Sequence, residues 1–227
     1  MKTIYEQRCR ICGCDWNHAC NDHDYWFVED VCSTCAEKMK PILFNTPMVR
    51  AILDGRKTAT RRVIKPQPEP FGKALAFKSG IYATPKALVR EAPYIPGDVL
   101  YVRETFAKNC WGTGWPWLYK ASPEYNEYEP DGWHPSIHMP KEAARIFLRV
   151  TDVRAERLQD MFASDVSNEG IYFTCHKTAD EMIKAFSQLW DTTVKKADRD
   201  KYGWAANPWV WVITFERIGK LEENADA

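Results

Sequence analysis

Alternating hydrophobic and polar positions are clearest near the C-terminus, in "NPWVWVITFERI". There Trp209, Trp211, Ile213 and Phe215 recur at every second residue, which is the period of a β-strand. The same period occurs in "GDVLYVRET", and strand character returns around residues 146–150. We expect these segments to be strands of one small sheet.

Helical signals lie between these strands. Residues 40–66 read as strand, helix and strand, with Thr46 as the expected N-cap, Pro47 in the first turn and Gly55 at the helix end. The sequence therefore predicts that the chain enters its second strand directly after a glycine-terminated helix.

Two further helices are expected in the second half of the chain. A short helix over residues 164–169 should end at Gly170. Thr178 and Glu181 have the spacing of a capping box. The helix that follows this box is expected to bury Ile183, Phe186 and Trp190.

Two proline-rich stretches interrupt the pattern. Residues 66–96 hold six prolines, and residues 106–140 hold five prolines and four tryptophans. Neither stretch has a sustained period, so both are expected to be long insertions between the strands. Composition also changes where a cysteine-rich segment gives way to the first strand. We expect an α+β protein with a cysteine-rich segment 1–39, a main domain 40–218 and a solvated tail 219–227.

Six of the eight cysteines fall within the first 35 residues. Cys9 with Cys12, and Cys32 with Cys35, form two Cys-x2-Cys pairs, the spacing by which two knuckles close a tetrahedral zinc site. We expect a structural zinc ion there, because so short a segment cannot draw its folding energy from a core. An iron–sulfur cluster or unligated thiols are the alternatives. Other side chains in the loop can serve as replacement or second-site ligands: Cys14, His18, Cys20 and His23.

Charge along the chain is uneven although the formal net charge is zero. Residues 50–65 hold six basic residues and one acid, whereas residues 124–131 hold four acids and no base. No hydrophobic run approaches the roughly 20 residues that cross a bilayer, and the N-terminus lacks the hydrophobic region of a signal peptide. We expect a cytoplasmic protein with no membrane partner.

The basic residues are densest in "GRKTATRR", directly after the first predicted helix. Cations and hydroxyls at this density suit phosphate or the polar edge of a base. Taken singly, an arginine here is expected to lie on a solvated strand face, but the group as a unit favours ligand binding. The expected ligand-binding residues are Arg56, Lys57, Thr58, Thr60, Arg61, Arg62 and Arg103.

Four motifs, taken in order, resemble the ASCH domain of the PUA-like superfamily: "GRKTATRR", "PGDVLYVRET", "SDVSNEGI" and "NPWVWVITFERI". They cover about Lys40 to Ile218, and the cysteine-rich N-terminus is similar to that of phage-type and prophage-type members. The resemblance implies a small β pseudo-barrel closed by helices, with a cleft between barrel and helices. RNA or a modified nucleoside is the expected partner, and DNA stays open.

Some ASCH members are small N4-acetylcytidine amidohydrolases that use a lysine, a threonine and a glutamate. By motif position these are Lys57, Thr60 and Glu169 in this chain. The resemblance implies Thr60 as nucleophile, Lys57 as its base and Glu169 as orienter or proton relay. In an ideal strand Lys57 and Thr60 face opposite sides, so a shared site requires a turn or bulge after Gly55.

Three functions are open from the sequence. The preferred one is a module that binds RNA, other nucleic acid or a modified nucleotide in a basic cleft. The second is an amidohydrolase acting on N4-acylated cytosine or a related amide. The third is an adaptor that binds a protein partner through its zinc segment. Convergence of Lys57, Thr60 and Glu169 in a cleft favours the second.

Overall fold

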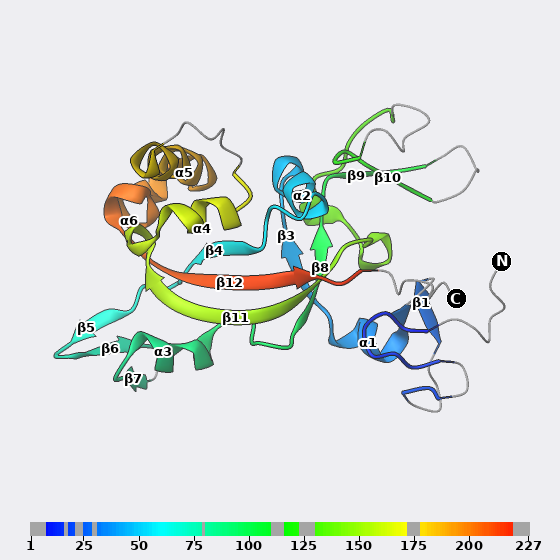
Figure 1. Ribbon diagram of the computed structural model, residues 1–227, viewed down its shortest axis with the longest axis horizontal. Helices are drawn as coiled ribbons and strands as arrows, with labels where there is room; N and C mark the ends of the chain where they lie inside the picture. The colour runs from blue at the N-terminus through cyan, green and yellow to red at the C-terminus, as the bar shows by residue number, and fades with distance from the viewer. Residues whose placement is uncertain are drawn as a thin grey trace. The chain divides into compact units, whose positions relative to one another are not determined.

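The computed structural model describes residues 8–15, 18–20, 25–28, 31–78, 80–109, 116–122, 130–171 and 178–219. Over these residues the fold is α+β, with short helices and several separate sheets (Figure 1). The predicted α+β class is therefore confirmed, but the β pseudo-barrel that the resemblance implied is not. The described strands form open sheets and not a closed barrel.

The chain divides into two compact units. Unit 1 comprises Met1–Val49, Asp98–Arg149 and Arg217–Ala227, and unit 2 comprises Arg50–Gly97 and Val150–Glu216. The cysteine-rich segment therefore belongs to unit 1, whereas the basic segment after Gly55 belongs to unit 2.

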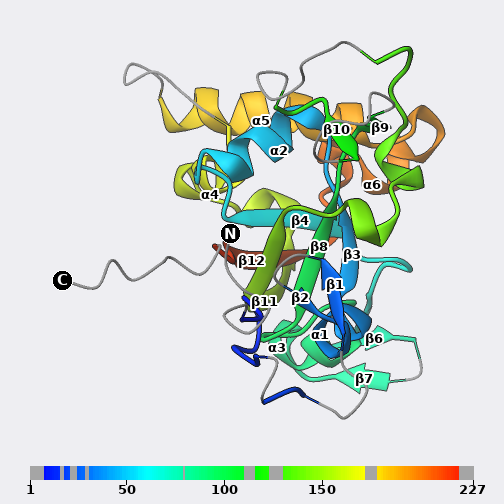
Figure 2. The ribbon, with the colours of Figure 1, turned by 90° about the vertical axis from the view of Figure 1, so that its right-hand side faces the viewer.

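Unit 1 is built around a parallel strand pair. β3 (Lys40–Leu43) runs parallel to β8 (Val99–Arg103), as Figure 2 shows, and the first residues of β11 (Phe147–Arg157) pair antiparallel with β8. The core joins this sheet to the cysteine-rich segment, since buried residues from both pack together: Val31, Ala36, Met39, Tyr101, Phe106 and Phe147. The cysteine-rich segment thus has a hydrophobic core in common with residues far along the chain.

Unit 2 contains the clearest predicted strand. β12 (Trp209–Arg217) pairs antiparallel with β4 (Ala59–Val63) and lies next to β11. The helices α4 (Ala163–Asn168) and α5 (Ala179–Thr193) lie together in Figure 1. They are held by one apolar core: Leu158, Met161, Val166, Phe186, Trp190, Val210 and Val212.

Helix starts test the capping predictions. In α5, Thr178 Oγ1 accepts from Glu181 N at 3.3 Å, and Thr178 N donates to Glu181 Oε2 at 2.8 Å, so the capping box is confirmed. In α2 (Thr46–Leu53) the expected cap, Thr46, is wrong. Asn45 caps this helix, because its Oδ1 accepts from Met48 N at 3.0 Å.

The first proline-rich insertion has a small sheet of its own. β5 (Glu69–Phe71), β6 (Ala74–Phe77) and β7 (Gly80–Tyr82) form an antiparallel three-stranded sheet, followed by α3 (Pro85–Leu88). Strands of three or four residues are too short to show a period of two in the sequence. For that reason the sequence predicted a long insertion without showing its strands, and the structure adds this small sheet.

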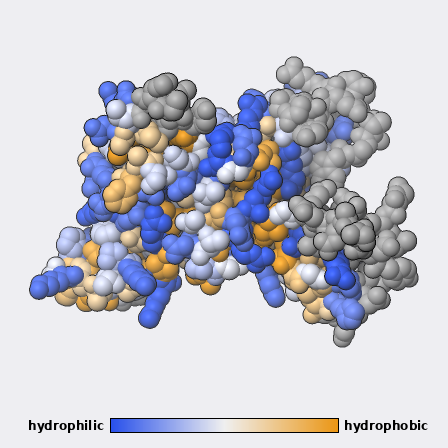
Figure 3. Space-filling view, in the orientation of Figure 1, coloured by the Kyte–Doolittle hydropathy of each residue, from blue (hydrophilic) through white to orange (hydrophobic). Residues whose placement is uncertain are grey.

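One face of the molecule shows how hydrophobic residues are distributed on the surface. On the face in Figure 3 they form small groups between hydrophilic residues. Among the described residues the most exposed large ones are Phe162, Ile137 and Ile81, which lie on different elements or loops. No helix in the described ranges is long and apolar enough to cross a bilayer.

Candidate functional site

Lys57 lies in the turn between α2 and β4. Gly55, with φ of +73°, ends the helix, and the backbone N–H groups of Arg56 and Lys57 both donate to Ala51 O at 2.9 Å. Lys57 then forms an isolated antiparallel bridge with Glu169, and β4 begins only at Ala59. The turn that the sequence required after Gly55 is present. Thr60 lies beyond this turn in β4, next to Arg61, whose side chain faces Glu169, so strand alternation directs the Thr60 side chain to the opposite face.

The side chains of Lys57 and Glu169 form a buried ion pair. Lys57 Nζ lies 2.7 Å from Glu169 Oε2 and also donates to Glu169 O at 3.0 Å and Ala59 O at 2.8 Å. The lysine side chain has no exposed surface, and the glutamate side chain is 6% exposed. Burial lowers the pKa of Lys57, although the negative charge of Glu169 opposes this shift.

Gly170 makes this approach possible. Its φ is +86°, a conformation that favours glycine. A Cβ atom at this position would lie 2.7 Å from Ala51 Cβ and 2.8 Å from Lys57 Cβ. The residue after Glu169 must therefore be small for the C-terminal end of α4 to pack against the Lys57 turn.

Arg61 is the second cation of the cluster. Its guanidinium lies 2.8 Å from Glu156 Oε1, 3.4 Å from Asp165 Oδ2 and 3.4 Å from Glu169 Oε1, and its side chain is 1% exposed. The expectation of a solvated strand face is wrong for this arginine, because acids from β11 and α4 cover it. Its Nε is buried with no hydrogen-bond partner in the described part of the chain.

The remaining predicted ligand residues differ in exposure. Thr60 is buried in β4, whereas Thr58 Oγ1 lies 3.4 Å from Asn168 Oδ1 near the surface. Arg56 is exposed, pairs with Asp54 at 2.6 Å and donates to Gly170 O at 2.8 Å.

Two arginines complete the predicted set. Arg62 is half-buried, and burial lowers its pKa, against the opposing charge of Glu169. Arg103 lies in unit 1, where its guanidinium donates to the backbone carbonyl of Ile137. The structure thus brings the catalytic candidate Lys57 and the ligand-binding candidate Arg61 to the catalytic candidate Glu169 within unit 2.

The sequence did not single out the acids that neutralise Arg61. Glu156 lies in the second half of β11, where only the first residues carried a strand signal, and Asp165 lies in the first turn of α4. Asp165 belongs to the quoted motif "SDVSNEGI", so its place beside Glu169 on one short helix was the available signal.

A separate hollow lies elsewhere in unit 2. It has a volume of about 360 Å³ and is lined by residues of α5, α6 (Arg199–Tyr202) and the turn after it, among them Asp191, Arg199, Asp200 and Trp204. It includes no residue of the Lys57 cluster.

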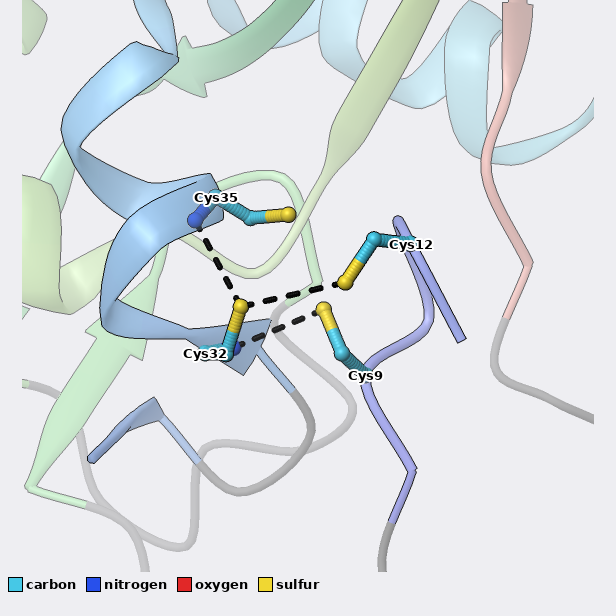
Figure 4. A group of neighbouring side chains, drawn as sticks. All are labelled: Cys9, Cys12, Cys32 and Cys35. Carbon is cyan, nitrogen blue, oxygen red and sulfur yellow. Dashed lines mark hydrogen bonds between the residues drawn. The ribbon is translucent and has the colours of Figure 1, made fainter. Parts of the chain in front are cut away.

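In unit 1 the cysteines come from two short structures. Cys9 and Cys12 lie on a tight turn, where Gly13 N donates to Cys9 O at 2.7 Å and Cys9 N donates to Cys14 O at 2.8 Å. Cys32 caps the helix α1 (Ser33–Lys38), and Cys35 N donates to Cys32 Sγ at 3.5 Å. The four sulfur atoms meet between the turn and the helix start (Figure 4).

Two groups of four cysteines are placed to bind a metal ion. Within each group all sulfur atoms lie within 4.8 Å of one another. One group is the predicted set Cys9, Cys12, Cys32 and Cys35, and the other is Cys12, Cys14, Cys20 and Cys32. None of these six cysteines forms a disulfide. Of the two histidine candidates, His18 contacts Asp15 Oδ1 at 3.0 Å, and His23 lies outside the described residues.

The thiols ionise unequally when no metal is bound. Burial works to raise the pKa of Cys12, but hydrogen bonds from Cys14, Cys20 and Cys35 outweigh it and lower this pKa to about 6. Burial raises the pKa of Cys32 to about 12, and it also raises that of Cys35. A bound cation is what allows neighbouring thiolates to be charged together.

No protein-family model matches this chain, and neither a curated protein nor a solved structure matches it. The resemblance to the ASCH domain therefore stays an interpretation of the sequence.

Proposed function

We propose that unit 2 is a nucleotide-binding module, with RNA or a modified nucleoside as its ligand, and that the Lys57 cluster is its recognition centre. The observation that carries this proposal is the burial of Lys57, Arg61 and Glu169 in one ion-paired group. Taking such charges out of water costs roughly several kcal/mol per ion, and apolar side chains of similar volume are often as stable. Buried charge of this kind is typical of functional sites.

The cluster offers groups that suit a base. Glu169 is an acceptor, and Arg61 has a buried Nε without a hydrogen-bond partner among the described residues. Base edges present amino donors beside carbonyl and ring-nitrogen acceptors, so a glutamate next to an arginine is complementary to them. Thr58, Asn168 and exposed Arg56 lie around the cluster and suit sugar or phosphate.

The ASCH resemblance supports the same assignment. Its motif positions include Lys57 and Glu169, which lie 2.7 Å apart in the structure. With it we propose a PUA-like relation for the main domain and zinc as the metal of the cysteine segment. A shell of four thiolates leaves no open position for substrate, so that zinc ion is structural.

Fluorescence anisotropy with labelled RNA, DNA and a panel of competing modified nucleosides tests this proposal. Arg56→Gln should weaken binding and reduce its salt dependence. A protein with one phosphate contact fewer releases fewer counterions from the nucleic acid when it binds. Arg90→Gln is the matched control, since Arg90 is an exposed arginine of unit 2 on a different element. Equal effects of the two substitutions, or no binding of any probe, would contradict the proposal.

Hydrolysis of an N4-acylated cytosine is a second candidate. It is favoured by the lowered pKa of Lys57, since a buried lysine that loses its proton more easily can act as a base. This reaction requires the Thr60 side chain, which alternates with Arg61 in β4, to turn toward Lys57. Thr60 Oγ then attacks the acyl carbon and its proton passes to Lys57. The C–N bond then breaks, the amine leaves with a proton passed through Glu169, and water hydrolyses the threonyl ester to acid and alcohol.

Chromatography of N4-acetylcytidine incubated with the protein tests this second candidate. Release of cytidine and acetate that is abolished by Thr60→Ala, and nearly abolished by Lys57→Arg, would support it, because arginine keeps the charge but does not act as a base. A parent protein that binds the nucleoside without releasing cytidine would leave only the binding function.

A further inference from the structure

The two cysteine groups of unit 1 have two members in common. Cys12 and Cys32 belong to both, so six sulfur atoms make up both groups. We propose that the segment holds a binuclear zinc–thiolate cluster in which Cys12 and Cys32 bridge the two ions. Cys9 and Cys35 are then terminal ligands of one ion, and Cys14 and Cys20 are terminal ligands of the other.

Three sulfur–sulfur distances among Cys12, Cys20 and Cys32 are close to the edge lengths of a zinc tetrahedron. With a zinc–sulfur distance of about 2.3 Å, neighbouring ligands of one tetrahedron lie roughly 3.8 Å apart. Cys12 Sγ lies 3.9 Å from Cys32 Sγ and 3.5 Å from Cys20 Sγ, and Cys20 Sγ lies 4.0 Å from Cys32 Sγ. The shared edge is the one between Cys12 and Cys32, the two sulfurs common to both groups.

A single ion leaves part of this arrangement unused. An ion in the first group leaves Cys14 and Cys20 as thiols within 4.8 Å of two bound thiolates. An ion in the second group leaves Cys9 and Cys35 in the same situation. Two ions with six thiolates use every one of these sulfurs, and bridging makes six thiolates sufficient where two separate sites need eight.

The charge of the binuclear cluster is no larger than that of a single site. Two Zn²⁺ ions with six thiolates carry two negative charges, as does one Zn²⁺ with four. Cations lie beside the cluster: the Arg149 guanidinium donates to Ile11 O at 3.4 Å, and Lys141 Nζ donates to Ala36 O at 2.8 Å. Ile11 precedes Cys12, and Ala36 follows Cys35. The two cations therefore lie close to the cysteines, where their positive charge favours an anionic cluster.

This inference does not depend on nucleotide binding and is tested without a nucleotide. Native mass spectrometry of the full chain, purified under reducing conditions without chelator, should show two zinc ions. After exchange with ¹¹³Cd, NMR should show two cadmium resonances coupled to each other through the bridging sulfurs. One metal per chain, two uncoupled resonances, or iron with acid-labile sulfide would overturn the proposal.

A variant identifies the ligands. The double variant Cys14→Ser with Cys20→Ser removes both terminal ligands of the second ion and should keep one metal per chain. Retention of two metals would overturn the assignment, because the second ion would then lie elsewhere. Should the variant lose all metal, the cadmium coupling in the parent protein still decides whether the cluster is binuclear.

Discussion

Lys57 and Glu169 are 112 residues apart in the sequence, and their side chains form an ion pair of 2.7 Å. Both are buried in unit 2, and the residue after Glu169 is a glycine that a larger residue could not replace without contact with Lys57. The stability of unit 2 and the chemistry of its candidate site therefore depend on the same contact.

Gly170→Ala should destabilise unit 2 by more than Gly55→Ala. Both glycines have positive φ, which costs an alanine roughly 1–2 kcal/mol. Only at Gly170 does the new methyl group also meet other side chains, at 2.7 and 2.8 Å, whereas nothing lies within 4 Å of one at Gly55. Urea unfolding of the two variants compares the losses, and equal losses would show that the close approach of Gly170 to Lys57 is not made in solution.

Glu169→Gln should cost more stability than Lys57→Met. Without Glu169 the buried Lys57 loses its carboxylate, whereas without Lys57 the glutamate still faces Arg61 at 3.4 Å. Removing one partner of a buried pair costs about 3–5 kcal/mol. Glu91→Gln is a control, because its pair with Lys78 is partly exposed and screened by solvent, so its loss should have little effect. Unfolding free energies in the reverse order would contradict this arrangement of charges.

The free energy of unfolding of the unsubstituted protein, relative to that of the Lys57→Met variant, should rise with pH in the alkaline range. Burial lowers the pKa of Lys57 below its usual 10.5, so between the two values the unfolded chain binds more protons than the folded protein. The free energy of unfolding then increases with pH across this window, and below it Lys57 contributes no pH dependence. Urea midpoints of both proteins at several pH values measure the difference, and a difference that falls as pH rises would contradict the lowered pKa.

Removal of metal should loosen unit 1 more than unit 2. Ile11, Cys35 and Met39 pack into the unit 1 core, so loss of the metal removes support from that core. Hydrogen exchange with and without chelator should show faster exchange in α1 and β3 but little change in β4 and β12. Equal acceleration in all four elements would mean that the metal stabilises the whole chain.

Local sequence patterns predicted individual strands and helices, but they did not predict which of these elements share a hydrophobic core. The period of β12 and the capping box at Thr178 are properties of adjacent residues, and the structure has both. The cap of α2 was misassigned by one residue, since Asn45 and Thr46 are both good caps and only the backbone decides between them. The core that joins Val31 to Phe147 has no local signal at all.

The candidate site shows the same division. Motif position indicated Lys57 and Glu169, and the structure pairs them. A solvated strand face was predicted for a single arginine of the basic segment, but Arg61 is buried because Glu156 and Asp165 reach it from other elements. A count of charges along the sequence cannot predict which acids the fold places beside a given arginine. The spacing of the cysteines likewise gave one group of four and not the second group that overlaps it.

Hydrogen exchange of the full chain with and without ligand tests the nucleotide-binding proposal most directly. The ligands are a panel of modified nucleosides, including N4-acetylcytidine, and short RNA oligonucleotides. We expect at least one of them to slow exchange in residues 56–62 and 165–170, where Lys57, Arg61 and Glu169 form the buried cluster. Binding that protects other segments and leaves these two unchanged, or no protection by any ligand, would contradict the proposed site.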